Sequence, residues 1–191
     1  MKLIENATAE KLRGGFYTPE LIAEFILLWG INGIKNLDIL EPSCGDGVFL
    51  EQLKILKAQY NSITAIEYDD EEAQKADKID LENKQIINDD FHTYCNNTLQ
   101  RFDLIVGNPP YIRYQFFDRQ QQVEAEDIFI KAGLTYSKLT NAWVSFVVGS
   151  SLLLKDKGGK IGFVLPAEVL QVSYALQLRQ FIAHFYIYDL Y

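Results

Sequence analysis

The sequence lacks the features that mark secreted, disulfide-stabilised and membrane-spanning proteins. It has two cysteines, Cys44 and Cys95, among 191 residues, which is too few for a disulfide framework. Its N-terminus has no apolar core of a signal peptide. The longest nearly apolar stretch, Ala142 to Leu154, is too short to span a bilayer. We therefore expect a cytoplasmic protein with no membrane partner.

An excess of basic charge is also missing. Lys and Arg number 18 against 26 Asp and Glu, which gives a formal net charge of -8. Proteins that bind nucleic acid unaided are usually basic, because neutralised phosphates supply most of the affinity. The charge argues against a self-sufficient DNA-binding module, but it leaves a local patch or a second domain open. With 48% hydrophobic residues, the chain is not intrinsically disordered.

Strand and helix patterns alternate along the chain. No repeat or linker divides it, so we expect one domain over residues 1–191. The expected strands are 37–40, 62–68, 84–88, 102–107, 160–165 and the start of a sixth at 185–191. The first expected helix begins after Thr18. The other expected helices cover 48–60, 69–77, two segments within 119–157, and 173–184. This alternation predicts an α/β fold: a mostly parallel, twisted sheet with helices on both faces.

The first helix has a clear start signal. Thr18 is a hydroxyl N-cap, Pro19 takes the first helical position, and Glu20 lies near the positive end of the helix dipole. Apolar residues then recur at spacings of three and four, which predicts a buried face. That face would consist of Leu21, Ile22, Phe25, Ile26 and Trp29.

The first expected strand ends in a glycine-rich loop, EPSCGDG, over residues 41–47. Gly45 and Gly47 would let the backbone turn tightly and approach a ligand. The spacing does not fit the GxGxxG dinucleotide fingerprint, and Glu41 suits a ligand with an ammonium group better than a pyrophosphate. The alternative is an ordinary glycine-rich turn between a strand and a helix.

Acidic residues also end the next two strands. Glu67 could accept hydrogen bonds from both ribose hydroxyls of a nucleoside, although alone it reads as a solvated acid. Asp89 or Asp90 could accept from an adenine amino group, with Phe91 over the ring face. Ligands bind at the carboxyl ends of parallel strands. Together, the three loops therefore predict one nucleoside-type site.

The fourth strand ends at Asn108-Pro109-Pro110-Tyr111. Two consecutive prolines stiffen the turn, so that the Asn108 amide oxygen and the Pro109 carbonyl become fixed acceptors. With the Tyr111 ring beside them, they suit a planar group that bears an NH2. The alternative is a rigid turn that merely ends a strand.

These motifs resemble those of S-adenosylmethionine-dependent amino-methyltransferases, most closely the adenine-specific DNA methyltransferases of restriction–modification systems. The segment GGFYTP, residues 14–19, is similar to the N-terminal cofactor motif of that group, and its position ahead of the glycine-rich loop is typical of the gamma class. Residues 108–115 (NPPYIRYQ) and 158–166 (GGKIGFVLP) also fit. The resemblance implies a Rossmann-like methyltransferase fold, with a cofactor-motif helix region over 1–36 and the core over 37–191.

The resemblance also implies roles for the loop residues. Asn108 and the Pro109 carbonyl would accept the hydrogens of N6 of a flipped-out adenine, with Pro110 stiffening the turn and Tyr111 stacking on the base. The product of the cofactor would be S-adenosylhomocysteine. Asp90 would accept from the cofactor's adenine amine, with Asp89 as the alternative. The implied cofactor contacts are Tyr17, Thr18, Glu41, Pro42, Gly45, Gly47, Glu67, Tyr68, Asp89, Asp90, Phe91 and Asn108.

Other chemistries are disfavoured. A cytosine C5 methyltransferase needs a cysteine at the fourth-strand loop, which has none. His92 and His184 have no second ligand at metal spacing, so no metal is expected. Two alternatives to DNA adenine remain: the same chemistry on an RNA adenine or a protein glutamine amide, and a non-catalytic cofactor-binding subunit or fragment.

The resemblance further suggests that this fold stops before its last strand and lacks a target-recognition domain. Tight binding of double-stranded DNA would then need a C-terminal recognition domain or a partner specificity subunit. A cognate endonuclease would be a further partner.

Overall fold

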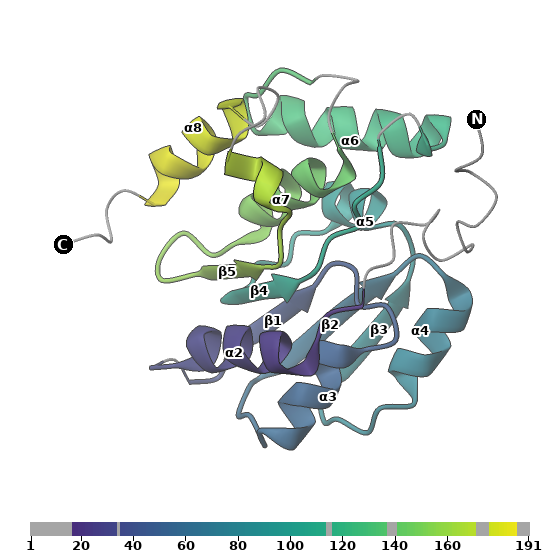
Figure 1. Cartoon of the computed structure of the whole chain (residues 1–191), viewed down its shortest axis with the longest axis vertical. Coiled ribbons are helices and arrows are strands. Elements are labelled where there is room, and N and C mark those ends of the chain that lie inside the picture. The colour runs from purple at the N-terminus through teal and green to yellow at the C-terminus, as the bar shows by residue number, and fades with distance from the viewer. Residues whose placement is uncertain (1–16, 34, 114–115, 137–140, 171–175, 187–191) are drawn as a thin grey trace.

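The computed structural model describes residues 17–33, 35–113, 116–136, 141–170 and 176–186. Within these residues a five-stranded, all-parallel sheet has the order β3-β2-β1-β4-β5 (Figure 1). Its strands are β1 (Asp38–Glu41), β2 (Ser62–Glu67), β3 (Lys84–Asn88), β4 (Leu104–Gly107) and β5 (Lys160–Phe163). The order reverses direction between β1 and β4, so ligand-binding loops are expected at the carboxyl ends of these two strands.

Helices cover both faces of the sheet, as the alternation predicted (Figure 1). One face carries α2 (Glu20–Ile31), α3 (Val48–Ile55) and α4 (Asp70–Asp77). The other carries α5 (Phe91–Asn97), α6 (Arg119–Lys131), α7 (Ala142–Leu153) and α8 (Leu176–Tyr186), with a short 3-10 turn at Ala167–Leu170. None of the helices in the described part of the chain is long and apolar enough to cross a membrane.

Two hydrophobic clusters, one on each face, hold the layers together. Ile39 and Leu104 point toward α2 and α3, whereas the neighbouring Leu40 and Ile105 point toward α5 and α7. Because both faces of the sheet are covered, the central strands β1 and β4 bury consecutive apolar residues rather than alternating ones. Trp143 of α7 is fully buried in the second cluster, which explains the long apolar stretch that ends near Leu154.

The predicted buried face of the first helix is wrong. Among the five residues assigned to it, Ile26 packs against the core, but Leu21 and Phe25 are 77% and 71% exposed. The buried residues are instead Ala23, Leu27 and Gly30. Thr18 is not the N-cap either, since Pro19 takes that position and no side chain caps the helix.

Close packing against the sheet explains which side of α2 is buried. A Cβ at Gly30 would lie 2.6 Å from Leu104 Cδ1, and a Cβ at Gly162 in β5 would lie 2.6 Å from Ile26 Cγ2. The helix therefore approaches the sheet closely at Gly30 and buries Leu27, and the large side chains of Leu21 and Phe25 lie on its exposed side. The periodicity of apolar residues cannot reveal this close approach, because it assigns the large apolar side chains to the buried face and gives no weight to glycine.

Several element boundaries also differ from expectation. The helix expected over 48–60 ends at Ile55, and Lys57 adopts a positive φ of 49°. The fourth strand begins at Leu104, because Phe102 instead bridges to Leu154, which also ends α7 before Lys157. The sixth strand expected from 185 is wrong at its start, since α8 continues to Tyr186. Residues 14–16 of GGFYTP and 187–191 lie outside the described residues.

Candidate functional site

A cavity of about 530 Å³ opens at the carboxyl ends of β1, β2, β3 and β4. It brings together most of the residues that the sequence singled out. Those lining it are Tyr17, Thr18, Glu41, Pro42, Gly45, Glu67, Tyr68, Asp89, Asp90, Phe91, Asn108 and Pro110. Gly47, Pro109 and Tyr111 are not among the lining residues.

Glu67 fastens the loops after β1 and β2 to each other. Its Oε2 accepts from the backbone N–H of Gly45 at 2.8 Å, and its Oε1 accepts from the N–H of Asp69 at 2.8 Å. Burial raises the pKa of Glu67 above its ordinary value. Each carboxylate oxygen can accept a second hydrogen bond. Glu67 can therefore shape the loops and still accept from a ligand's hydroxyls.

Glu41 is the least compensated group in the site. Its side chain is 1% exposed, and Oε2 has no hydrogen-bond partner among the described residues. Burial raises the pKa of Glu41 well above its ordinary value, and the nearby carboxylates of Glu67 and Asp46 raise it further. A buried carboxyl without a partner is destabilising, so its presence at a cavity wall indicates a cationic ligand.

The rest of the lining has the same electrostatic character. The acidic lining residues are Glu41, Asp46, Glu67, Asp69, Glu72, Asp89, Asp90 and Asp118. No Lys or Arg is found among the lining residues in the described ranges. In a partly enclosed site of low dielectric, such a set of acids attracts positive charge and repels a phosphate-rich ligand.

Gly47 shapes the loop between β1 and α3. It has a φ of 97°, and an added Cβ would lie 2.4 Å from Ile79 Cδ1. Gly45 has a φ of 53°, but an added Cβ would meet nothing within 4 Å. Both glycines thus serve the turn, and only Gly47 is also needed for close packing.

We expect Gly47→Ala to lower the free energy of unfolding by about 3 kcal/mol, because a left-handed backbone and a steric overlap act together. Gly45→Ala, the matched control, should lower it by about 1 kcal/mol, from the backbone alone. Urea unfolding followed by circular dichroism measures both values. Equal losses in the two variants would contradict the packing role of Gly47.

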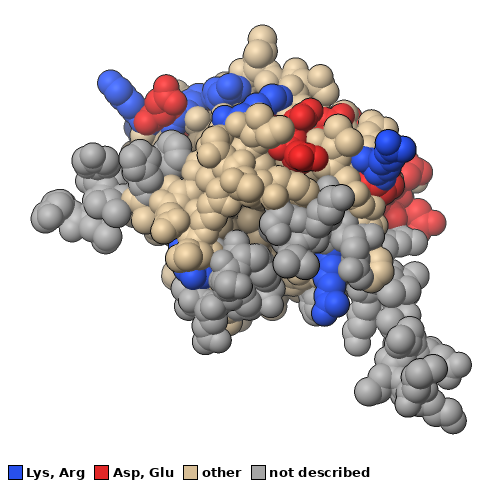
Figure 2. Space-filling view, turned by 90° about the horizontal axis from the view of Figure 1, so that it is seen from above, with Lys and Arg blue, Asp and Glu red and all other residues tan. Residues whose placement is uncertain are grey.

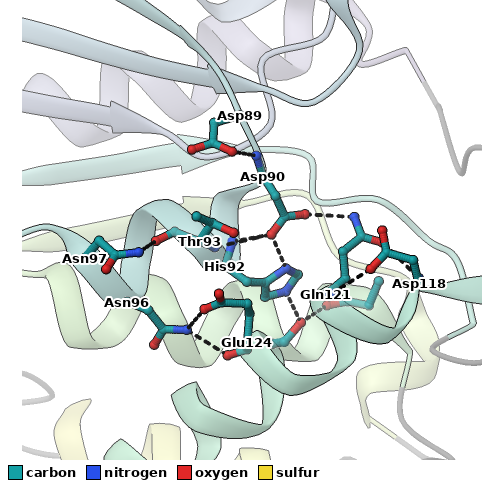
Figure 3. Close-up of polar contacts among 11 residues, drawn as sticks. Asp89, Asp90, His92, Thr93, Asn96, Asn97, Asp118, Gln121 and Glu124 are labelled. Atoms are coloured by element: carbon teal, nitrogen blue, oxygen red, sulfur yellow. Dashed lines mark hydrogen bonds and ion pairs between the residues drawn. The ribbon is translucent and has the colours of Figure 1, made fainter.

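Asp90 caps α5 and is held by several donors (Figure 3). Its Oδ1 accepts from the backbone N–H of His92 at 2.8 Å and lies 3.0 Å from the ring Nδ1 of His92. Burial alone would raise the pKa of Asp90, but the hydrogen bonds from His92 and Gln121 hold it below its ordinary value. Asp89 instead uses Oδ1 to accept from the N–H of Asp90 at 2.8 Å.

Phe91 lies differently from the expectation that it covers a ligand ring. It lines the cavity, but its side chain is only 2% exposed and stacks on Phe146 at a centroid distance of 4.7 Å. Phe91 therefore belongs mainly to the core beneath the site. The exposed aromatic side chains on the cavity wall include Tyr17, Tyr68 and Phe116.

The loop after β4 is held from two sides. Ser43 Oγ donates to the Asn108 backbone carbonyl at 3.4 Å. The Tyr111 hydroxyl lies 2.6 Å from Asn108 Oδ1 and 2.9 Å from the carbonyl oxygen of Val164. Burial raises the pKa of Tyr111 to about 12, so its hydroxyl remains a donor at neutral pH. The Tyr111 hydroxyl thus orients the Asn108 side chain at the end of β4.

Comparison with known proteins gives the family. The model of the Eco57I restriction-modification methylase matches residues 22–190. The chain belongs to this family. The Type II methyltransferase M.HincII of Haemophilus influenzae is 32% identical over 170 residues, which cover 88% of this chain and 31% of that protein. The chain spans about a third of the length of the curated relatives it matches first.

Solved structures show the same fold as this methylase-family chain. A Listeria monocytogenes protein described as a class I S-adenosylmethionine-dependent methyltransferase superposes with a TM-score of 0.72 at 18% identity, covering 94% of this chain and 54% of that one. The methyltransferase subunit of a type I restriction-modification system from Streptococcus thermophilus gives 0.70 at 19% identity, covering 88% and 38%. The expected Rossmann-like methyltransferase fold is confirmed.

Sequence reasoning missed part of the site in this methylase-family chain. Gln121 lines the cavity from the first turn of α6, and His92 and Ser145 stand behind Asp90. One signal was available for Gln121, because Asp118 and Gln121 have the spacing of a capping box, which the structure contains. The contact between His92 and Ser145 joins distant segments and leaves no local pattern.

Proposed function

We propose that this chain is the catalytic domain of a DNA adenine N6-methyltransferase of a restriction–modification system, with S-adenosylmethionine as its cofactor. The observation that carries the proposal is the buried, unpartnered carboxyl of Glu41 in an acid-lined cavity beside the rigid Asn108 loop. The cofactor carries an ammonium and a sulfonium, whose positive charges complement the acidic groups of the cavity. Membership of a restriction-modification methylase family supports the same conclusion.

The lining residues fit the parts of this cofactor. Glu41 would face the methionine ammonium, and Glu67 would accept from the ribose hydroxyls. Thr18, which is 8% exposed and lines the cavity, would contact the methionine carboxylate together with Tyr17. Asp90 would accept from the adenine amine, with Asp89 as the alternative acceptor. When bound, S-adenosylmethionine supplies a methyl group on a positively charged sulfur.

The Asn108 loop would hold the target amine. Asn108 Oδ1 and the Pro109 carbonyl accept its two hydrogens and turn its nitrogen lone pair toward the cofactor. This is catalysis by positioning and by stabilisation of developing positive charge. In this arrangement Tyr111 stacks on a base that has left the duplex. Its hydroxyl, bonded to Asn108 and Val164, fixes the edge of the ring that would meet the base.

Tight DNA binding would come from elsewhere. Figure 2 shows basic and acidic side chains in small separate groups around a largely uncharged centre, without a continuous basic band on that face. With a net charge of -8, the chain offers little counterion release to drive binding. A recognition domain or a specificity subunit would supply the missing basic surface, and a cognate endonuclease would be the functional partner in the cell.

Isotope transfer tests the function. The purified chain is incubated at low salt with unmethylated double-stranded DNA and tritiated S-adenosylmethionine, and the DNA is then digested to nucleosides for mass spectrometry. Label in N6-methyladenine is the expected result. Label in N4-methylcytosine would replace the assigned base, and label in RNA or in a protein glutamine, each offered in a parallel incubation, would replace DNA as the substrate. Cofactor binding without transfer to any of them would favour the non-catalytic alternative.

At a pH below the raised pKa of Glu41, cofactor binding should release a proton, since a bound cation favours the carboxylate over the carboxylic acid. Affinity should therefore rise with pH until the raised pKa is passed. Calorimetry in buffers of different ionisation enthalpy measures the protons released. Methylthioadenosine, which has neither the ammonium nor the sulfonium, should bind with no release. Equal heats for S-adenosylmethionine in all buffers would contradict the role of Glu41.

A further inference from the structure

Gln121 extends from the start of α6 toward Asp90 (Figure 3), and both residues line the cavity. Its side-chain Nε2 donates to Asp90 Oδ2 at 2.8 Å. Its Oε1 accepts from the backbone N–H of Asp118 at 3.2 Å, and Asp118 Oδ1 accepts from the N–H of Gln121 at 2.8 Å. These contacts orient the amide, because the oxygen faces a donor and the nitrogen faces a carboxylate. One hydrogen of Nε2 is therefore directed at Asp90 Oδ2.

The two oxygens of Asp90 have different surroundings. Oδ1 is occupied by the backbone N–H groups of His92 and Thr93 and by the His92 ring, which is itself fully buried and 2.7 Å from Ser145 Oγ. Oδ2 accepts from Gln121 alone among the described residues. A carboxylate oxygen accepts two hydrogen bonds, so Oδ2 retains one free position. His92 and Ser145 fix Asp90 so that this position remains available.

Gln121 likewise has one hydrogen to spare. An amide NH2 carries two, and only the one directed at Asp90 Oδ2 is used within the described residues. Asp90 Oδ2 and Gln121 Nε2 thus form an acceptor and a donor side by side. Adenine offers the complementary pair along one edge, an amine hydrogen next to a ring nitrogen, and side chains recognise adenine in this two-bond manner.

We propose that Gln121 and Asp90 read the adenine ring of the cofactor together: Asp90 Oδ2 accepts from the exocyclic amine, and Gln121 Nε2 donates to the adjacent ring nitrogen. Gln121 is then a specificity-determining residue rather than only a helix cap. The inference rests on the proposed function, which places the cofactor's adenine at the end of β3. A hypoxanthine ring would present an oxygen to the Asp90 carboxylate and be rejected.

Binding of base-modified cofactor products tests the pairing. Calorimetry compares S-adenosylhomocysteine with its 1-deaza and 7-deaza analogues. The 1-deaza analogue lacks the ring nitrogen bonded to the amine-bearing carbon. The 7-deaza analogue lacks the ring nitrogen on the other side of the amine, which is bonded to the neighbouring carbon. For the unaltered chain, one analogue should bind about tenfold more weakly than the parent. Gln121→Ala should bind the parent about tenfold more weakly and lose the difference between parent and that analogue. Gln120→Ala, an exposed neighbour on the same helix, should change neither affinity.

The outcomes separate this inference from the function on which it rests. If Gln121→Ala keeps the full deaza penalty, or if neither analogue shows a penalty, Gln121 only caps α6 and the inference is overturned. If the unaltered chain does not bind S-adenosylhomocysteine at all, the proposed function fails and the inference fails with it. Thermal unfolding of the ligand-free variants checks that Gln121→Ala is folded.

Asp90→Asn gives a second, independent readout. The substitution replaces a pure acceptor by an amide that can also donate. We expect the preference for S-adenosylhomocysteine over S-inosylhomocysteine to fall by at least about tenfold, because the amide can donate to the hypoxanthine oxygen. An unchanged preference would show that Asp90 does not face the exocyclic group, and it would overturn the two-residue reading.

Discussion

Replacing Asn108 by alanine is expected to lower the rate of methyl transfer by about 100- to 1000-fold, the loss typical when an oriented polar group that acts in the transition state is removed. Cofactor affinity should fall far less, by about threefold, since the other contacts proposed for the cofactor remain. The loop should keep its shape, because Tyr111 can still donate to the carbonyl oxygen of Val164 at 2.9 Å.

Single-turnover experiments with the chain in excess over DNA measure this rate and avoid the weak binding of DNA. Asn108→Asp is the matched variant, since its carboxylate still offers acceptors for the amine hydrogens. It should retain at least about tenfold more activity than Asn108→Ala. Transfer by the alanine variant at the original rate would show that the Asn108 side chain does not hold the target amine.

The position of the site was predictable because parallel strands send their carboxyl ends to one edge. Glu41 and Glu67 end β1 and β2, and Asp90 and Asn108 follow β3 and β4, so the topology brings all four to one cavity. No knowledge of packing was needed. The residues of the site could therefore be predicted from short local motifs, each at the end of a strand.

The features that sequence reasoning missed depend on contacts between distant segments. The buried side of α2 is set by its approach to Leu104 and Gly162, which no pattern within the helix encodes. The link from Gln121 to Asp90 joins the start of α6 to the start of α5. Phe91 was predicted to cover a ligand ring, but its side chain stacks on Phe146 of α7 and belongs mainly to the core. The topology of the sheet sets where each residue lies, and packing between distant segments sets which way its side chain points.

Glu41→Gln should have opposite effects on stability and on function. At a pH above the raised pKa, the folded protein holds an unpaired buried carboxylate, and its removal should raise the free energy of unfolding by about 1 kcal/mol. An acid whose pKa is raised on folding contributes stability below its unfolded pKa and loses it as pH rises through the folded value. The gain should therefore be present at alkaline pH and small at acidic pH, as urea unfolding at both can show.

The same variant should bind S-adenosylmethionine about 100-fold more weakly, since the ligand's cation loses its buried counter-charge. Glu51→Gln removes one negative charge from the exposed face of α3 and lies outside the cavity, so it should alter neither affinity nor stability by a comparable amount. Equal losses of affinity in the two variants would attribute the effect to overall charge. A loss confined to Glu41→Gln means that the carboxyl destabilises the empty protein and is retained because it binds the cofactor, which is the trade expected at a functional site.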